Sequence, residues 1–306
     1  MEQAALTVER LRFASAVRAR LTLKGYANDW RFFAAWCAGV QRCALPATGE
    51  TAALYVTQML NDGKKITTAL RHACAIAYLH RAEGLESPCD GEVWDLLRGA
   101  QRIRHERPVQ KAPLGMEQLR AICARLSHEC LIDVRNRAIL LLGFATALRR
   151  STLAKLDLAD VSLDNRGVTI FVRYEKQDQA GIGRAIAVPF GHDGLCAVSA
   201  LREWLERRGT WPGPLFVGTR AGQSRRRLHR YTIAMVVKRC VKLIGLDESR
   251  YAGHSLRAGF VTEAIGRGLS DVLVASQTGH RCLATLRRYY RPTDPFQSNA
   301  CALMGL

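Results

Sequence analysis

The N-terminal third of the chain carries a helical spacing of apolar side chains. Three stretches repeat apolar residues at every third or fourth position: Trp30–Cys37, Leu54–Met59 and Leu70–Tyr78. This spacing places the apolar side chains on one face of a helix. Turn residues at Asn61–Gly63 and Glu83–Gly84 separate the stretches, and a last short helix is predicted near Val93–Leu97. The pattern predicts an all-α domain over residues 1–107.

The pattern changes at Arg98. The stretch Arg98–Pro113 is polar and basic and contains two prolines, which is typical of a connector, and we place the linker at residues 108–113. Its charge suits a strap lying along phosphates, and a solvated connector is the alternative.

Beyond the linker the pattern predicts a mixed domain over residues 114–306. Helices are expected at Glu117–Leu126, Val134–Leu148, Leu195–Arg208, Tyr231–Ile244, His254–Gly266 and Val272–Ser276. The segments Val168–Tyr174 and Arg184–Val188 are rich in β-branched residues and predict a β-hairpin. The expected fold is therefore mainly α with a small β-sheet.

The charge of the chain points to a polyanionic partner. Lys and Arg total 45 against 27 Asp and Glu, a net charge of +18, and both predicted domains are basic. The positive electrostatic potential of such a chain favours nucleic acid as the partner. An anionic membrane surface, or no partner at all, are the alternatives.

Cysteines and hydropathy indicate an intracellular protein. The 10 cysteines form no CxxC pair and show no zinc-finger spacing with histidines, so reduced, mostly buried thiols are expected. The N-terminus lacks the pattern of a signal peptide, and the longest apolar run, Ala138–Ala147, is too short to span a membrane. We expect a soluble, cytoplasmic and nucleoid-associated protein without membrane contact.

Four separated motifs in the second domain carry polar side chains that suit one chemistry. They are Thr146–Arg149, Lys176 in the hairpin loop, His254–Arg257, and Gly279-His280 with Tyr289 nine residues on. Taken singly, each has an ordinary explanation: an ion-paired arginine, a solvated lysine, a helix cap or a packed tyrosine. Their combination is what points to phosphodiester chemistry.

Each residue type in this set has a role in phosphoryl transfer. Arg149 and Arg257 offer planar forks for the two non-bridging oxygens, and their charge offsets the negative charge of the transition state. The Tyr289 phenol is a candidate nucleophile, and Lys176 can protonate the departing 5′ oxygen. His254 and His280 can hold the phosphate or accept the phenolic proton. No clustered carboxylates accompany them, so we expect no metal and no cofactor.

The distance from His280 to Tyr289 predicts a bend. Nine residues of one continuous helix turn by about 900°, which would put the two side chains on opposite faces. We therefore predict a bend after Leu283–Arg287, with Tyr289 on a separate, movable piece.

The order Arg, Lys, HxxR, GH, Tyr resembles the tyrosine recombinase (phage integrase) family of Cre- and Xer-like site-specific recombinases. The family motifs TGLR, HxLR and LGH correspond to TALR, HSLR and TGH here, and EKQDQ is similar to the lysine-bearing hairpin. The sequence of Asn28–Phe33 resembles a stretch of the family's core-binding domain, so the resemblance covers nearly the whole chain. Two departures are Ala147, where the family often has Gly, and Thr152, where it often has an acid. Tyr290 competes with Tyr289, but the spacing from His280 favours Tyr289.

The resemblance implies an architecture and a mechanism. An N-terminal helical core-binding (SAM-like) domain and an α+β catalytic domain would form a C-shaped clamp on DNA. Tyr289 would form a 3′-phosphotyrosine and free a 5′-hydroxyl, without ATP or metal, during integration, excision or resolution of a mobile element. The partners would be double-stranded DNA with a specific recombination site and a homo-tetramer in synapsis, monomeric or dimeric off DNA. The segment Phe296–Leu306 would pack against neighbours, a frayed tail being the alternative.

Further DNA contacts and rival functions remain open from the sequence. Candidate phosphate contacts are Lys64, Lys65, Arg71, Arg225, Arg226, Arg227 and Arg230, and a solvated charged face is the alternative. The rival functions are a catalytically silent DNA-binding protein on the same fold and a type IB topoisomerase-like relaxing enzyme.

Overall fold

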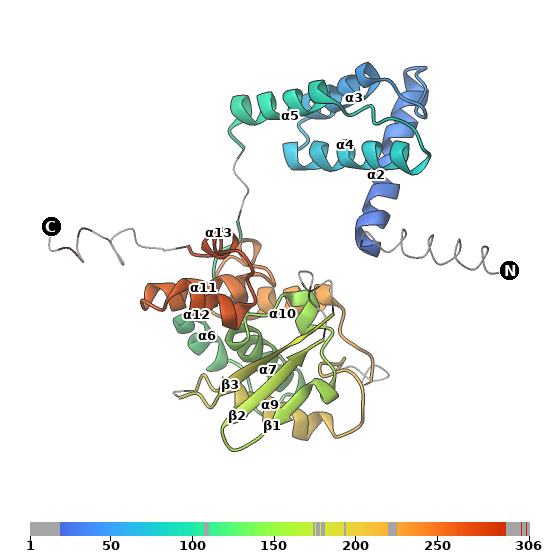
Figure 1. The fold of residues 1–306 in the computed structure, drawn as a ribbon. Helices are drawn as coiled ribbons and strands as arrows, with labels where there is room; N and C mark the ends of the chain where they lie inside the picture. Colours follow the sequence, from blue (N-terminus) through green and yellow to red (C-terminus); the bar gives the residue numbers. More distant parts are fainter. Residues whose placement is uncertain are drawn as a thin grey trace. The chain divides into compact units, whose positions relative to one another are not determined.

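The computed structural model describes residues 19–106, 110–173, 175, 178, 181–192, 194–219, 225–291, 301 and 304. The chain divides between residues 109 and 110 into two compact units, which are described separately (Figure 1). The mainly α fold with one small sheet is the predicted one. The predicted C-shaped clamp concerns the placement of the two units and stays a prediction.

The first unit is helical in its described part. Its helices are α2 (Arg20–Gly39), α3 (Gly49–Asn61), α4 (Ile66–Ala82) and α5 (Gly91–Arg104). The apolar stripes predicted from the sequence meet in one core, in which Phe33, Val56 and Ile76 are fully buried. Side-chain caps fix the starts of two helices: Thr48 accepts from the Thr51 N–H, and Asp90 accepts from the Glu92 N–H.

Helix α5 is longer than the sequence pattern predicted. The connector was expected to begin at Arg98, but the helix continues to Arg104. The guanidinium of Arg104 donates to the carbonyls of Leu60, in the last turn of α3, and Lys64, just beyond it, which holds the polar last turns in place. Because α5 buries only Val93 and Leu97, most of its surface is solvated and polar.

A buried carboxylate joins three helices of this unit. Asp29 is 1% exposed and accepts two hydrogen bonds from Arg71, of 2.6 and 2.8 Å. His72 Nε2 lies 3.2 Å from Asp29, and the Tyr55 hydroxyl lies 2.9 Å from His72 Nδ1. One edge of the Arg71 guanidinium therefore compensates a buried charge, a role that the prediction of Arg71 as a phosphate contact missed. Lys64 and Lys65 are exposed, and their DNA contacts stay a prediction.

The second unit combines helices with one sheet. Its elements are α6 (Met116–Cys123), α7 (Leu131–Ala145), α8 (Arg150–Leu153), η1 (Leu158–Asp160), β1 (Val161–Leu163), β2 (Gly167–Val172), β3 (Arg184–Pro189), α9 (Ala197–Arg208), α10 (Arg230–Leu243), η2 (Glu248–Arg250), α11 (Ser255–Gly266), α12 (Asp271–Thr278) and α13 (Leu283–Arg287). The predicted helices and hairpin are confirmed. Strand β1 was missed, since three residues are too few to show alternation.

The sheet is antiparallel in the order β1-β2-β3 (Figure 1). Val168 pairs with Val188 and Ile170 pairs with Ile186, so their buried side chains share one face. That face joins the same apolar core as α7 and α9. The loop between β2 and β3, which carries Lys176 in the sequence, thus starts from a rigid base.

Part of the predicted linker is bonded to the second unit. The Ala112 N–H donates to Arg250 O, and the Leu114 N–H donates to Ser255 O at 3.0 Å. Leu114 also lies so close to α11 that a Cβ on Gly259 would be 1.9 Å from its carbonyl oxygen. These contacts fix the start of α11, where His254 is the N-cap and Arg257 lies in the first turn.

The structure also bears on three other expectations from the sequence. Of the 10 cysteines, Cys37, Cys89 and Cys240 are buried and the other seven are partly or fully exposed, so the prediction of mostly buried thiols was wrong. Among the described helices, none is both long and apolar enough to cross a membrane. Of the predicted interaction segment Phe296–Leu306, all but Cys301 and Met304 lie outside the described residues.

Candidate active site

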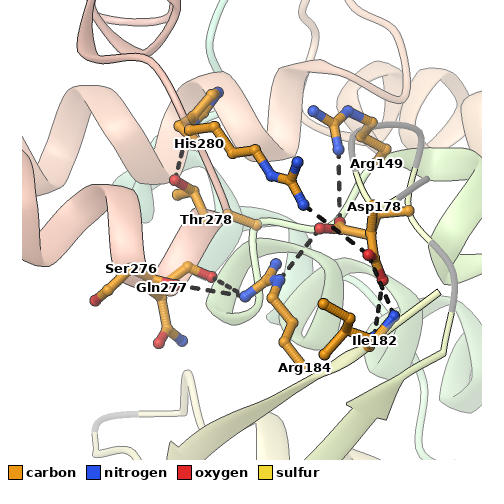
Figure 2. Close-up of polar contacts among 12 residues, drawn as sticks. Arg149, Asp178, Ile182, Arg184, Ser276, Gln277, Thr278 and His280 are labelled. Carbon is orange, nitrogen blue, oxygen red and sulfur yellow. Dashed lines mark hydrogen bonds and ion pairs between the residues drawn. The ribbon is translucent and has the colours of Figure 1, made fainter. Parts of the chain in front are cut away.

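Four segments of the second unit bring five of the six predicted residues together. They are the turn after α7 with Arg149, the start of α11 with His254 and Arg257, the turn after α12 with His280, and the turn after α13 with Tyr289. Figure 2 shows Arg149, Arg184 and His280 around one cluster of polar contacts, with Asp178 of the hairpin loop beside them. Lys176 lies outside the described residues, so its placement stays a prediction.

Arg257 is the most deeply buried of these side chains, with 0% exposure. Its Nη1 donates to Ala147 O at 2.7 Å and to Thr278 O at 2.8 Å, and its Nη2 lies 2.9 Å from His280 Nε2. Its Nε has no hydrogen-bond partner within the described part of the chain. Burial, then the charge of Arg149, lowers the pKa of Arg257 to about 10, so the guanidinium stays charged at neutral pH.

Ala147 has a backbone conformation that explains why the family motif TGLR often has glycine at this position. Its φ is 48°, in the left-handed region that costs an L-residue roughly 1 kcal/mol. This conformation accompanies the hydrogen bond from Arg257 to its carbonyl. The alanine therefore places a side chain where the backbone conformation favours glycine.

His280 is held as a neutral imidazole. Gly279, with a φ of 70°, ends α12 and turns the chain so that His280 follows in the buried site. The Thr278 hydroxyl donates to Val274 O at 2.7 Å, so it accepts from His280 Nδ1 at 2.6 Å, and Nε2 accepts from Arg257. Burial, followed by the charge of Arg257, lowers the pKa of His280 to about 3.

This lowered pKa predicts a loss of stability in acid. Below the ordinary value of 6.5, the unfolded chain binds a proton at His280 that the folded chain refuses down to about 3. Unfolding therefore becomes easier as the pH falls, by on the order of 2 kcal/mol between pH 7 and pH 5. Denaturant unfolding at both pH values should show that His280→Gln loses less stability over this interval than the unaltered chain does. Equal losses in the two proteins would contradict the neutral assignment.

His254 precedes α11 and differs from His280 in its access to solvent. It is the N-cap residue of α11 and is exposed. Although its surface is open, the surrounding protein atoms partly desolvate the ring, and this, with the charge of Arg150, lowers the pKa of His254. His254 is thus a neutral, accessible imidazole near Arg257 at neutral pH.

Tyr289 packs beside this cluster. Its ring centroid lies 5.1 Å from that of His280, and the Arg257 Cζ lies 5.3 Å from the ring centre. The ring packs against the apolar cluster of Val261, Val274 and Leu286, as does Tyr290.

Between α12 and Tyr289 the chain changes direction twice. The chain turns between Gly279 and Cys282, before α13, and the Tyr289 N–H donates to Leu286 O at 2.8 Å in the turn that closes α13. Helix α13 covers Leu283–Arg287, and Tyr289 follows in the turn after it, so the predicted position of the bend is confirmed. The left-handed Gly279 adds a turn that was not predicted, and the mobility of the piece with Tyr289 stays a prediction.

Known proteins are similar to this chain over most of its length. Residues 114–295 match the model of the phage integrase family. The chain is 35% identical over 302 residues to an integrase/recombinase xerD homolog of Selenomonas ruminantium, covering 96% of this chain and 88% of the relative. This chain belongs to the phage integrase family. Membership confirms the prediction of a site-specific tyrosine recombinase.

More distant proteins are similar to this chain in sequence or in fold. A tyrosine recombinase XerC of Corynebacterium efficiens is 26% identical over 280 residues, covering 89% of this chain and 81% of the relative. A lambda integrase dimer bound to a COC′ core site matches with a TM-score of 0.65 at 19% identity, covering 94% of this chain and 95% of that one. The Tn1549 transposon integrase with transposon right end DNA matches with a TM-score of 0.66 at 16% identity, covering 99% of each. These likenesses confirm the predicted fold.

Two residues of this integrase site were missed from the sequence. Glu175 lies 3.6 Å from Arg149 Nη1 and 3.1 Å from Arg184 Nε, so it supplies near Arg149 the negative charge that Thr152 lacks. Arg184 in turn donates to Ser276 O and Gln277 O (Figure 2). The signal was present in the EKQDQ motif, but a carboxylate beside a lysine in a polar loop is ordinarily solvated.

Of the basic residues predicted to contact DNA from this unit, Arg227 has a role inside the protein. Its Nη1 donates to Lys155 O at 2.7 Å and Leu156 O at 3.2 Å, and its Nη2 donates to Asp157 at 2.5 Å. These bonds satisfy carbonyls that follow α8. The Arg227 guanidinium is therefore bonded within the protein, whereas the sequence predicted that it contacts a DNA phosphate. Arg225, Arg226 and Arg230 are exposed, and their DNA contacts stay a prediction.

Proposed function

We propose that this integrase-family protein cuts and rejoins double-stranded DNA at a specific site through a 3′-phosphotyrosine on Tyr289. The observation that supports it most is the buried Nε of Arg257, which is unpartnered among the described residues and lies in a cationic cluster beside Tyr289. A buried donor of this kind calls for an acceptor, and a phosphate oxygen supplies one.

The proposed reaction assigns a role to each of the six residues predicted from the sequence. The Tyr289 oxygen attacks phosphorus, and the bond from phosphorus to the 5′ oxygen breaks. Arg149 and Arg257 bind the non-bridging oxygens and offset the charge of the transition state. Lys176 protonates the departing 5′ oxygen. In the second step a 5′-hydroxyl of the partner duplex attacks the phosphotyrosine and releases the Tyr289 phenol.

The two histidines take different roles. Both nitrogens of His280 are occupied, by Thr278 and Arg257, so His280 orients Arg257. The neutral and exposed His254 accepts the phenolic proton as Tyr289 attacks. The bond energy stays in the phosphotyrosine, and the two arginines and Lys176 supply the positive charge. The reaction therefore requires neither ATP nor a metal ion.

We extend the proposal to partners by comparison with relatives. Solved relatives are bound to a difH substrate, a COC′ core site and a transposon right end. The predicted core-binding domain, residues 1–107, acts with the catalytic domain in holding a recombination site, and a homo-tetramer joins two sites in the cytoplasm. The DNA that carries the site is a mobile element, which the protein integrates, excises or resolves.

The test traps the covalent intermediate without assuming a target sequence. Denatured protein–DNA adducts are recovered from cells that express the protein, and the attached 3′ ends are sequenced. A nicked duplex of the recurrent sequence then serves as a suicide substrate in EDTA without ATP. We expect one recurrent sequence and an adduct in this mixture. Scattered ends with relaxation of any plasmid would indicate a topoisomerase, and absence of an adduct would indicate a silent DNA-binding protein.

A further inference from the structure

A single buried carboxylate lies between two arginines at the base of the hairpin loop. Glu175 follows β2, immediately precedes Lys176 in the sequence, and has a side chain that is 6% exposed. Its Oε1 lies 3.6 Å from Arg149 Nη1, and its Oε2 accepts from Arg184 Nε at 3.1 Å. A carboxylate that deep in the protein is stable only with such partners.

Arg184 connects this carboxylate to the segment that leads to His280. It begins β3, and its Nη1 donates to Gln277 O at 3.0 Å and to Ser276 O at 3.4 Å in the last turn of α12. It passes so close to Gly279 that a Cβ there would lie 2.8 Å from Arg184 Nε. The base of the hairpin is therefore tied to α12 just before the chain turns into the site.

The carboxylate also opposes a repulsion within the cluster. Arg149 and Arg257 are like charges close enough that Arg149 lowers the pKa of Arg257, while Glu175 raises it. With a neutral group at position 175, the repulsion would favour rotation of the less buried Arg149 away from Arg257. A fixed guanidinium orientation is what a phosphate fork requires.

We propose that Glu175 is a positioning residue, which holds Arg149 in its phosphate-binding orientation while Arg184 anchors it to α12. This proposal rests on the function proposed above. Arg149 is then preorganised only while the base of the hairpin is seated against α12, which couples the first arginine of the site to the loop that carries Lys176.

The main test compares Glu175→Gln with Asp164→Asn in single-turnover cleavage of the nicked duplex. Both changes remove one negative charge from the same sheet, but Asp164 lies in the turn between β1 and β2, at the other end of β2 from Glu175. We expect Glu175→Gln to slow cleavage roughly 100-fold with DNA binding retained, because small misplacements of a clamp carry such costs. Asp164→Asn should cleave at the unaltered rate. Unaltered cleavage by Glu175→Gln overturns the proposal.

A sulfur leaving group separates positioning of Arg149 from placement of the lysine. A duplex with a bridging 5′-phosphorothiolate needs no proton at its leaving group, so it should relieve the defect of Lys176→Ala. The defect of Glu175→Gln should persist, because the charge on the non-bridging oxygens is unchanged. If sulfur relieves both variants equally, Glu175 serves Lys176 alone and the proposal is wrong.

The role of Arg184 as the anchor to α12 is tested with Arg184→Gln and with the double variant that combines Glu175→Gln and Arg184→Gln. If Glu175 and Arg184 act as one unit, the double variant should be no slower than the slower single variant. Multiplied defects would overturn the coupling to α12. Thermal unfolding of each variant shows that the cleavage rates compare folded proteins. An unaltered chain that forms no adduct would instead overturn the proposed function, so the two failures are distinguishable.

Discussion

Tyr289→Phe is expected to abolish the covalent adduct, while Tyr290→Phe retains it. Phenylalanine keeps the ring that packs against Val261, Val274 and Leu286, and it removes only the nucleophilic oxygen. The contact of the ring with Arg257 also remains available. The variant should therefore fold, bind the recombination site and form no phosphotyrosine.

The matched pair decides between two adjacent phenols. Tyr289 and Tyr290 pack against the same apolar cluster, so the two substitutions carry similar structural consequences. The measurement is the yield of denaturation-resistant protein–DNA complex from the suicide duplex, with binding followed by gel shift. An adduct formed by Tyr289→Phe and lost in Tyr290→Phe would move the nucleophile to Tyr290.

Arg257→Lys is expected to slow cleavage by roughly 10³-fold, in the range found when a transition-state arginine is removed. Lysine keeps the positive charge but loses the planar fork, which here reaches Ala147 O, Thr278 O and His280 together. It cannot replace these bonds and also face a phosphate. Carbonyls left unsatisfied in the interior should lower the stability by about 1–3 kcal/mol each.

Arg267→Lys at the end of the same helix is the control. Arg267 lies just past the last residue of α11, its side chain is 60% exposed, and its Nε lies 3.7 Å from Glu263. This change should leave cleavage and unfolding almost unaltered, as is usual for surface pairs. Single-turnover cleavage and denaturant unfolding of both variants provide the comparison. Cleavage by Arg257→Lys at the unaltered rate would contradict the role given to its fork.

The sequence by itself predicted most of the elements and the class of protein. Helical stripes such as Trp30–Cys37 and the β-branched run that became β2 were predictable because burial of one face dictates their period. The motifs with Arg149, His254, Arg257 and His280 were recognisable because their residue types and order suit a phosphodiester, and the family comparison confirmed the class of protein.

Only the tertiary structure decided which charges are used inside the protein. Arg71 pairs with Asp29, Arg227 with carbonyls after α8, and Arg149 with Glu175. Each partner is distant in sequence, and nothing in the local pattern distinguishes an arginine that meets a buried acceptor from one that faces solvent. The backbone at Ala147 and the turn at Gly279 were settled in the same way, since they depend on how α7, α11 and α12 pack around Arg257.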